Sequence, residues 1–355
     1  MKPPAPRRRL FVHRPRRWQT HGFNLRSEDG ILAMHVEPAE MGVFVEMTYS
    51  HPSIAVIVMA MVFDDAERFG AWCDADAARF NYPCSSTTSS GMEAHSSGDG
   101  DWAQPRQLHD LTSAAGYADA VTAIVERVTG ANDPSQAVML LQQASRRMGA
   151  DAAVFVSFIP DDGSHASYRF LLACDPSWCF EYQRQLSLAD DPWLDYARRH
   201  SEPACASAIG ARSKTQQDVH SLAERFGFRS AVIVPAPSGV GLSRAGMLCL
   251  GSSTPGFFEA DGFITLRTLA RGLAMELHEW WIAKLRRELI DDAEVTEGEL
   301  KLLQWEWQGL NSKQIGNLLG MGPAGVDSRF QRLNLKLGVP NRRAAAKLAA
   351  EYGLI

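Results

Sequence analysis

The sequence predicts an α+β protein, in which an α-β-α sandwich with an antiparallel sheet precedes an all-α domain. Between residues 108 and 288, segments with helical periodicity alternate with short runs rich in β-branched and aromatic residues. After residue 295 only helical patterns remain. A central sheet with helices on both faces is the simplest packing of the first pattern, and two domains, or three, fit a chain of 355 residues.

The elements of the sandwich follow from these periods. We expect helices over residues 118–128, 135–148, 177–186, 193–200, 216–226 and 257–287. We expect strands over residues 152–159, 168–173, 230–234 and 245–250, joined in pairs by turn-rich stretches. A pocket between such a sheet and its helices is a natural place for a small molecule.

The pattern of residues 295–355 is that of a helix-turn-helix. Two short helices meet at the turn Gly320-Met321-Gly322, and Pro323 suits the first turn of the second helix. One face of the second helix carries apolar residues at helical spacing, namely Val326, Phe330, Leu333 and Leu337. The expected partners of this stripe are Ile315, Leu318 and Leu319. The opposite face is polar and mostly basic, which suits a DNA major groove.

Seven residues of this domain are candidates for contact with double-stranded DNA. They are Lys313, Asp327, Ser328, Arg329, Gln331, Arg332 and Lys336. The four basic residues suit phosphates, whereas Gln331 suits adenine. Asp327 either accepts from a cytosine amino group or acts as a local charge at the helix start, and both interpretations stay open. The net charge of −5 does not oppose DNA binding, because the segment 295–355 holds eight Lys and Arg residues and five acids.

This domain resembles the LuxR-type DNA-binding domain. The resemblance rests on Thr296 with Glu299 soon after, on Gly309 before the first motif helix, and on the Lys-Leu-Gly-Val exit over 336–339. In this family the residues that read bases follow a valine that Val326 matches. The resemblance therefore assigns base reading to Asp327, Ser328 and Gln331. Gly325 replaces the usual threonine.

The preceding domain resembles the autoinducer-binding domain of LuxR-type quorum-sensing regulators. The motifs are Trp178-x-x-x-Tyr182, Asp191-Pro192 and the segment 226–230, within a resemblance over about 118–252. The resemblance implies an acyl-homoserine lactone ligand whose lactone carbonyl accepts from Trp178, whose acyl carbonyl accepts from Tyr182 and whose amide N–H donates to Asp191. Cys249 stands where a small polar residue often closes the pocket. The acyl chain is expected against Phe155, Phe170, Leu172 and Leu250.

One departure from the family keeps a second interpretation open. The family usually has another tryptophan about fifteen residues after the aspartate, whereas residues 202–207 contain no aromatic side chain. We therefore expect a more open pocket floor. A regulator that needs no ligand, or that senses a non-lactone molecule, is the alternative.

The N-terminal part of the chain gives a weaker pattern. We expect residues 1–105 to be a poorly defined extension with a Ser/Gly-rich linker over 84–101, containing one strand over 54–63 and one helix over 66–80. The first 21 residues carry seven Lys and Arg and no acid, which suits an arm that binds nucleic acid or an anionic surface or, less well, a transit peptide. A natural translation start at Met92 is also compatible with this sequence. These considerations predict that residues 1–91 are dispensable for folding and for DNA binding.

The sequence thus predicts a cytoplasmic transcription regulator, with a sensor domain over residues 106–289 and a DNA-binding domain over 295–355. We expect a homodimer, with the long helix 257–287 and the Ala-rich helix 343–352 as contact surfaces, and no membrane partner. We expect no cofactor besides the ligand, and no metal, because the six cysteines form no CxxC pair. The sequence has no recurring nucleophile–base spacing, which argues against an enzyme. It also lacks the strand–helix alternation of a phosphorylated response regulator, which argues against that class.

Overall fold

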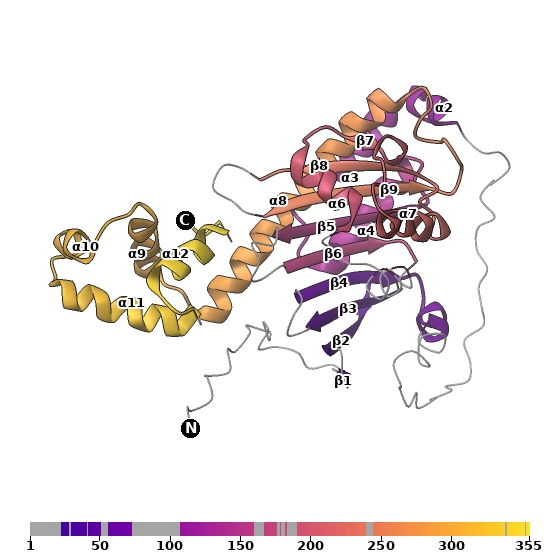
Figure 1. Ribbon diagram of the computed structural model, residues 1–355. Helices are drawn as coiled ribbons and strands as arrows, with labels where there is room; N and C mark the ends of the chain where they lie inside the picture. The colour runs from indigo at the N-terminus through magenta and orange to yellow at the C-terminus, as the bar shows by residue number, and fades with distance from the viewer. Residues whose placement is uncertain are drawn as a thin grey trace.

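The computed structural model describes residues 23–27, 30–40, 42–50, 56–72, 107–159, 167–175, 178, 182, 190–238, 244–337, 339–351 and 353–355. Its sheet has nine strands in the order β1-β2-β3-β4-β6-β5-β9-β8-β7 (Figure 1). The strands are β1 (Phe23–Ser27), β2 (Gly30–Ala39), β3 (Gly42–Ser50), β4 (Val56–Phe63), β5 (Ala152–Ile159), β6 (Ser167–Ala173), β7 (Ala204–Cys205), β8 (Ser230–Ala236) and β9 (Ala245–Ser252).

Helices cover both faces of the sheet, so the predicted α-β-α sandwich is confirmed (Figure 1). These helices are α2 (Leu108–Ser113), α3 (Tyr117–Val125), α4 (Pro134–Arg147), α6 (Pro192–Arg199), α7 (Lys214–Arg225) and α8 (Phe263–Ala293). Strands β5 to β9 pair antiparallel, as predicted. Local signals explain the helix starts: the side chain of Asp133 caps α4, and Pro134 follows at its first position.

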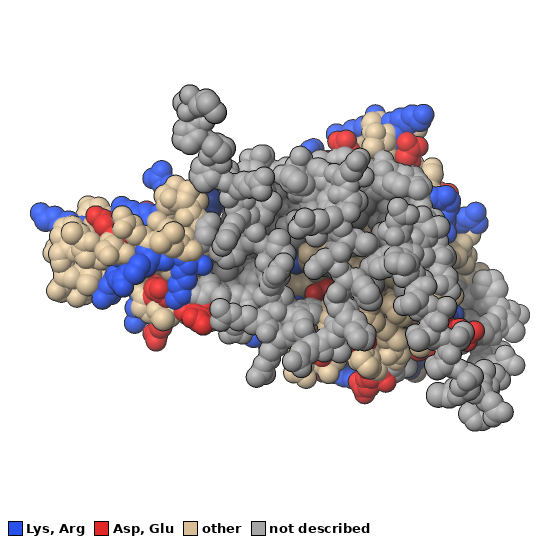
Figure 2. All heavy atoms as spheres, turned by 90° about the horizontal axis from the view of Figure 1, so that it is seen from below, with Lys and Arg blue, Asp and Glu red and all other residues tan. Residues whose placement is uncertain are grey.

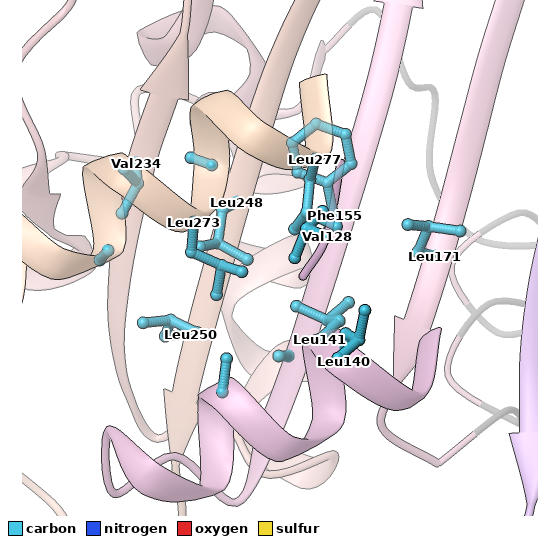
Figure 3. Close-up of a cluster of buried hydrophobic side chains, with 14 of the residues drawn as sticks. Val128, Leu140, Leu141, Phe155, Leu171, Val234, Leu248, Leu250, Leu273 and Leu277 are labelled. Carbon is cyan, nitrogen blue, oxygen red and sulfur yellow. The ribbon is translucent and has the colours of Figure 1, made fainter. Parts of the chain in front are cut away.

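The larger core lies between the sheet and the layer of α3, α4 and α8. Figure 3 shows leucines of α4 and α8 meeting apolar side chains of β5, β6, β8 and β9 in one cluster. Helix α8 begins at Phe263, later than the predicted residue 257, because Phe257 and Phe258 are buried in the turns that precede it. The second core lies on the opposite face, under α6 and α7.

The N-terminal part differs most from the expectation. Instead of one strand, it supplies four, and β4 pairs parallel to β6. Met47, Met59 and Met61 are buried in the same core as residues of β5 and β6. These strands were not predicted because the segment has too few apolar residues for a core of its own, and its apolar side chains are buried only once β4 pairs with the distant strand β6. This packing argues against the prediction that residues 1–91 are dispensable. The predicted linker 84–101 lies outside the described residues.

The C-terminal domain consists of α9 (Glu297–Trp307), α10 (Ser312–Leu319), α11 (Pro323–Leu337) and α12 (Arg342–Glu351), beyond the end of α8 (Figure 1). Thr296 and Glu299 form a capping box at the start of α9. No separate linker lies between the predicted domains 106–289 and 295–355, since α8 continues through Ala293 and ends at Glu294 with a left-handed φ of 46°.

The apolar stripe of α11 is buried as predicted. Val326 and Phe330 pack with Leu302 and Ile315, whereas Leu333 and Leu337 belong to a second cluster. Leu318 is 59% exposed, so its assignment as a partner of the stripe was wrong. It lies on the outer side of the short helix α10, which turns Ile315 inward.

The Ala-rich helix α12 is not a free surface. Ala345 and Ala349 pack against Val295, Leu303 and the end of α11, and Ala346 and Ala350 are also buried. The small side chains permit the close approach of another helix, as expected, but the helices that approach α12 are α9 and α11 of the same chain. The buried alanines are therefore not available for a dimer contact, and the expected contact through this helix is left to its outer face, where Arg343 and Lys347 are exposed.

Helix α8 also carries a buried histidine. The Nε2 atom of His278 lies 2.7 Å from the Ser238 hydroxyl, and no part of the residue is exposed. Burial, and secondarily Arg244, lowers the pKa of His278 from 6.5 to about 4. Folding therefore favours the neutral imidazole.

We predict an acid-sensitive stability from His278. The contribution is complete above pH 6.5 and is lost as the pH falls from 6.5 towards 4, by roughly 3 kcal/mol at most. His278→Gln should flatten the dependence of the unfolding midpoint on pH across this window, measured by circular dichroism. His109→Gln, at an exposed position, is the control. An unchanged acid limb in His278→Gln would contradict this assignment.

Among the described residues, no helix combines the length and the apolar character needed to cross a bilayer. No group of three or more His, Cys, Asp or Glu side chains in the described part of the chain is arranged to hold a metal ion.

Candidate ligand cavity and nucleic-acid interface

The four predicted ligand residues meet at one cavity under α6. Its lining consists of Val154, Val156, Phe170, Trp178, Tyr182, Asp191, Trp193, Leu194, Phe228, Met247 and Cys249. Strand alternation turns Val154, Val156 and Cys249 to the same face of the sheet. The cavity volume is about 10 Å³, which is close to the space of one water molecule. A larger ligand therefore requires outward movement of the lining side chains.

Asp191 is the polar centre of this cavity. One carboxylate oxygen accepts from the backbone N–H groups of Trp193 at 2.7 Å and Leu194 at 3.0 Å, which caps α6. The other oxygen accepts from the Tyr182 hydroxyl. Burial raises the pKa of Asp191, and these hydrogen bonds partly oppose that rise. The carboxylate thus serves as a helix cap and remains at the cavity wall.

Aromatic rings form most of the remaining wall. Trp178 stacks on Tyr182 with ring centroids 4.9 Å apart, and Phe228 lies 6.0 Å from Trp178. Trp193 stacks on His220 at 5.5 Å. The Nε1 atoms of Trp178 and Trp193 are buried, and neither has a hydrogen-bond partner in the described part of the chain. Two residues of the cavity lining therefore hold buried donors without a partner among the described residues.

The predicted apolar lining was right at Phe170 and wrong at Phe155 and Leu250. Both of the latter point to the opposite face, into the core against α4 and α8, because they alternate with Val154, Val156 and Cys249. Leu172 lies in the core on the cavity face but is not among the lining residues.

The expected open pocket floor is not found. Trp193 and Phe228 contribute rings to the wall, so the cavity is small although residues 202–207 hold no aromatic side chain. The cavity lining also includes residues that were not predicted, namely Val154, Val156, Trp193, Leu194 and Met247. Trp193 and Leu194 directly follow the Asp191-Pro192 motif, and a correct assignment of strand faces would have placed Met247 beside Cys249.

Cys249 has the character of a packing residue. Burial raises the pKa of its thiol well above the ordinary value, with further contributions from Asp191 and Cys174. The thiol stays protonated, so it is a poor nucleophile and a weak hydrogen-bond donor.

The candidate DNA face lies on the outer side of α11. Asp327, Ser328, Arg329, Gln331 and Arg332 are exposed there, and Lys313 of α10 is exposed as well. Lys and Arg side chains gather on the C-terminal lobe in Figure 2, interrupted by a few acids. This distribution suits a phosphate backbone.

Two of the predicted DNA residues have partners within the chain. Asp327 accepts from the Ser312 hydroxyl at 2.6 Å and lies 3.8 Å from Arg342, which favours its interpretation as a local charge. Lys336 donates to the backbone oxygen of Glu294 at 2.6 Å and to Glu299 at 2.7 Å. Arg329 and Arg332 are thus better phosphate candidates than Lys336.

Comparison with known proteins agrees with this arrangement. Residues 133–280 match the autoinducer binding domain family. The chain is 23% identical over 244 residues to the transcriptional activator protein AhyR of Aeromonas hydrophila, covering 67% of this chain and 92% of AhyR.

Two solved structures share the fold. Escherichia coli SdiA is 17% identical, with a TM-score of 0.53, over 66% of this chain and 97% of SdiA. A structure of SdiA in complex with octanoyl-rac-glycerol is 16% identical, also with a TM-score of 0.53, over 68% and 98% of the two chains. The chain thus carries an autoinducer-binding domain over residues 133–280 and a helix-turn-helix after it, which is the arrangement expected for a LuxR-type regulator.

Proposed function

We propose that this protein is a cytoplasmic, DNA-binding transcription regulator controlled by an acyl-homoserine lactone. The observation that carries the proposal is the meeting of Trp178, Tyr182, Asp191 and Cys249 at one buried cavity within the autoinducer-binding domain. Trp178 carries a donor for one carbonyl, Tyr182 carries a donor for a second once its hydroxyl leaves Asp191, and Asp191 is then an acceptor for an amide. These are the polar groups of that ligand class. A catalytic role forms no part of the proposal.

Control of DNA binding would follow from a shift between two states. Ligand binding opens and fills the small cavity, and the filled sensor is the state that pairs as a homodimer. A dimer presents two copies of α11 to half-sites about one helical turn apart. Sedimentation of the purified protein with and without lactone tests this step, and an unchanged mass would contradict it.

The first test is thermal unfolding of the purified protein with a panel of acyl-homoserine lactones. A ligand that binds only the folded state raises the midpoint in proportion to the logarithm of its concentration. We expect at least one lactone to do so. No stabilisation by any member of the panel would exclude this ligand class.

Arg332 and Gln331 should have different effects on DNA binding. Arg332→Ala removes an exposed cation, so affinity should fall similarly on all duplexes and the salt slope should fall by about one unit. Gln331→Ala should instead relax the preference at one base position. Fluorescence anisotropy with selected and scrambled duplexes measures both. A change of sequence preference in Arg332→Ala alone would contradict the assigned face.

A second candidate is the same regulator with a different ligand. The small aromatic cavity, and the absence of an aromatic side chain over residues 202–207, favour it. SdiA has been solved with octanoyl-rac-glycerol, an acyl compound without a lactone ring. Stabilisation by acyl glycerols and not by lactones would favour this candidate.

A further inference from the structure

Helix α11 carries an exposed leucine near its C-terminal end. Leu335 is 83% exposed, more than the exposed apolar residues Ile264, Trp307 and Leu318. Single exposed apolar side chains are common on protein surfaces, so exposure alone indicates no function. The position of Leu335 on the helix, however, indicates one.

Leu335 lies on the same line of the helix as two residues proposed to read bases. Ser328, Gln331 and Leu335 recur at i, i+3 and i+7, so their side chains project from one side of α11. All three are exposed. The buried stripe of α11 faces the opposite way, and it consists of Val326, Phe330, Leu333 and Leu337. A duplex that meets Ser328 and Gln331 therefore also meets Leu335.

The charged residues near Leu335 lie to the side of this line. Lys336 is bound to the backbone oxygen of Glu294 and to Glu299, so its ammonium group points back towards the start of α9. Arg332 is exposed beside the line and suits a phosphate. The line that carries Ser328 and Gln331 thus ends in an apolar side chain and not in a cation.

An apolar side chain has one matching partner in the major groove. Among the groups that base pairs present there, the C5-methyl group of thymine is apolar, whereas the others donate or accept hydrogen bonds. The side chain of Leu335 can neither donate nor accept, so contact with a guanine oxygen or a cytosine amino group would leave that group without a partner. The leucine therefore favours thymine.

We propose that Leu335 contacts the methyl group of a thymine and is a further specificity-determining residue of α11. The inference rests on the proposed DNA-binding function and names one base of the bound site. Leu335 follows Gln331 by four residues, which is about 6 Å along the helix, or roughly two base-pair steps. The thymine should therefore lie about two base pairs from the position that Gln331 reads.

Removal of the thymine methyl group tests this contact directly. The full chain, with the lactone panel present, selects a duplex from a randomised pool, and each thymine of that duplex is then replaced in turn by deoxyuridine, which lacks only the methyl group. In fluorescence anisotropy the wild-type affinity should fall about fourfold at one thymine of each half-site, as expected for one buried methyl group. Leu335→Ala should not respond to deoxyuridine at that thymine. Leu335→Met keeps an apolar side chain and should retain the response.

Leu318→Ala is the matched control, because Leu318 is also an exposed leucine of this domain but belongs to α10. It should keep the wild-type response to deoxyuridine. If the chain binds no duplex, the proposed function fails together with this assignment. If a duplex is bound but no deoxyuridine replacement weakens it, or Leu335→Ala keeps the wild-type response, the role of Leu335 alone is overturned. A lower mass of Leu335→Ala in sedimentation would also overturn it, in favour of a contact between two chains.

Discussion

Deletion of residues 1–72 should abolish the folded sensor. The deletion exposes the edge of β6 and removes Met47, Met59 and Met61 from the core that contains Phe170 and the cavity wall. Each large buried side chain contributes about 1.5–3 kcal/mol, and folded domains are stable by only about 5–15 kcal/mol. We expect an insoluble chain, or one without a cooperative unfolding transition, measured by solubility and circular dichroism.

A point variant separates this effect from a general effect of truncation. Met59→Asp places a charge in the same core at full chain length, and it should lower the unfolding midpoint strongly. Arg68→Ala changes an exposed side chain of the same segment and should have little effect. If a chain beginning at Met92 is soluble and unfolds at the wild-type midpoint, the N-terminal strands are dispensable after all.

The second large effect is expected at Asp191. Asp191→Ala removes the buried acceptor proposed for the ligand amide, and water does not easily replace it in so small a cavity. Hydrogen bonds to charged groups contribute about 1.5–3 kcal/mol, so the affinity should fall at least tenfold and the thermal response should disappear. Tyr182→Phe should cost less, because it keeps the ring that stacks on Trp178.

Asp191 also caps α6, so the variant loses some stability for a reason unrelated to ligand. Asp133→Ala is the control for the loss of a helix cap, because Asp133 caps α4 through one backbone N–H group, that of Gln136, and is not among the cavity-lining residues. It should lose stability and keep a normal ligand response. Intrinsic DNA affinity should be unchanged in both variants. An undiminished ligand response in Asp191→Ala would contradict the proposed pocket.

The sequence alone determined the features that depend on local patterns. The strands of the sandwich are short apolar runs between turn signals, its helices follow a period of 3.6, and caps such as Asp133 with Pro134 mark the helix starts. The helix-turn-helix is local in the same sense, since the stripe from Val326 to Leu337 lies on one helix. Trp178, Tyr182 and Asp191 were found because their spacing along the chain resembles that of a family.

Tertiary structure decided which surfaces these elements share. Phe155 and Leu250 belong to apolar strands buried on both faces, so their composition does not tell which face meets the cavity. Strands β1 to β4 join the sheet through a pairing with β6 that no local pattern encodes. Lys336 and the α12 alanines have the residue types of a DNA contact and a dimer contact, yet each meets partners within its own chain. Such choices depend on contacts between distant segments, and only the folded chain brings those segments together.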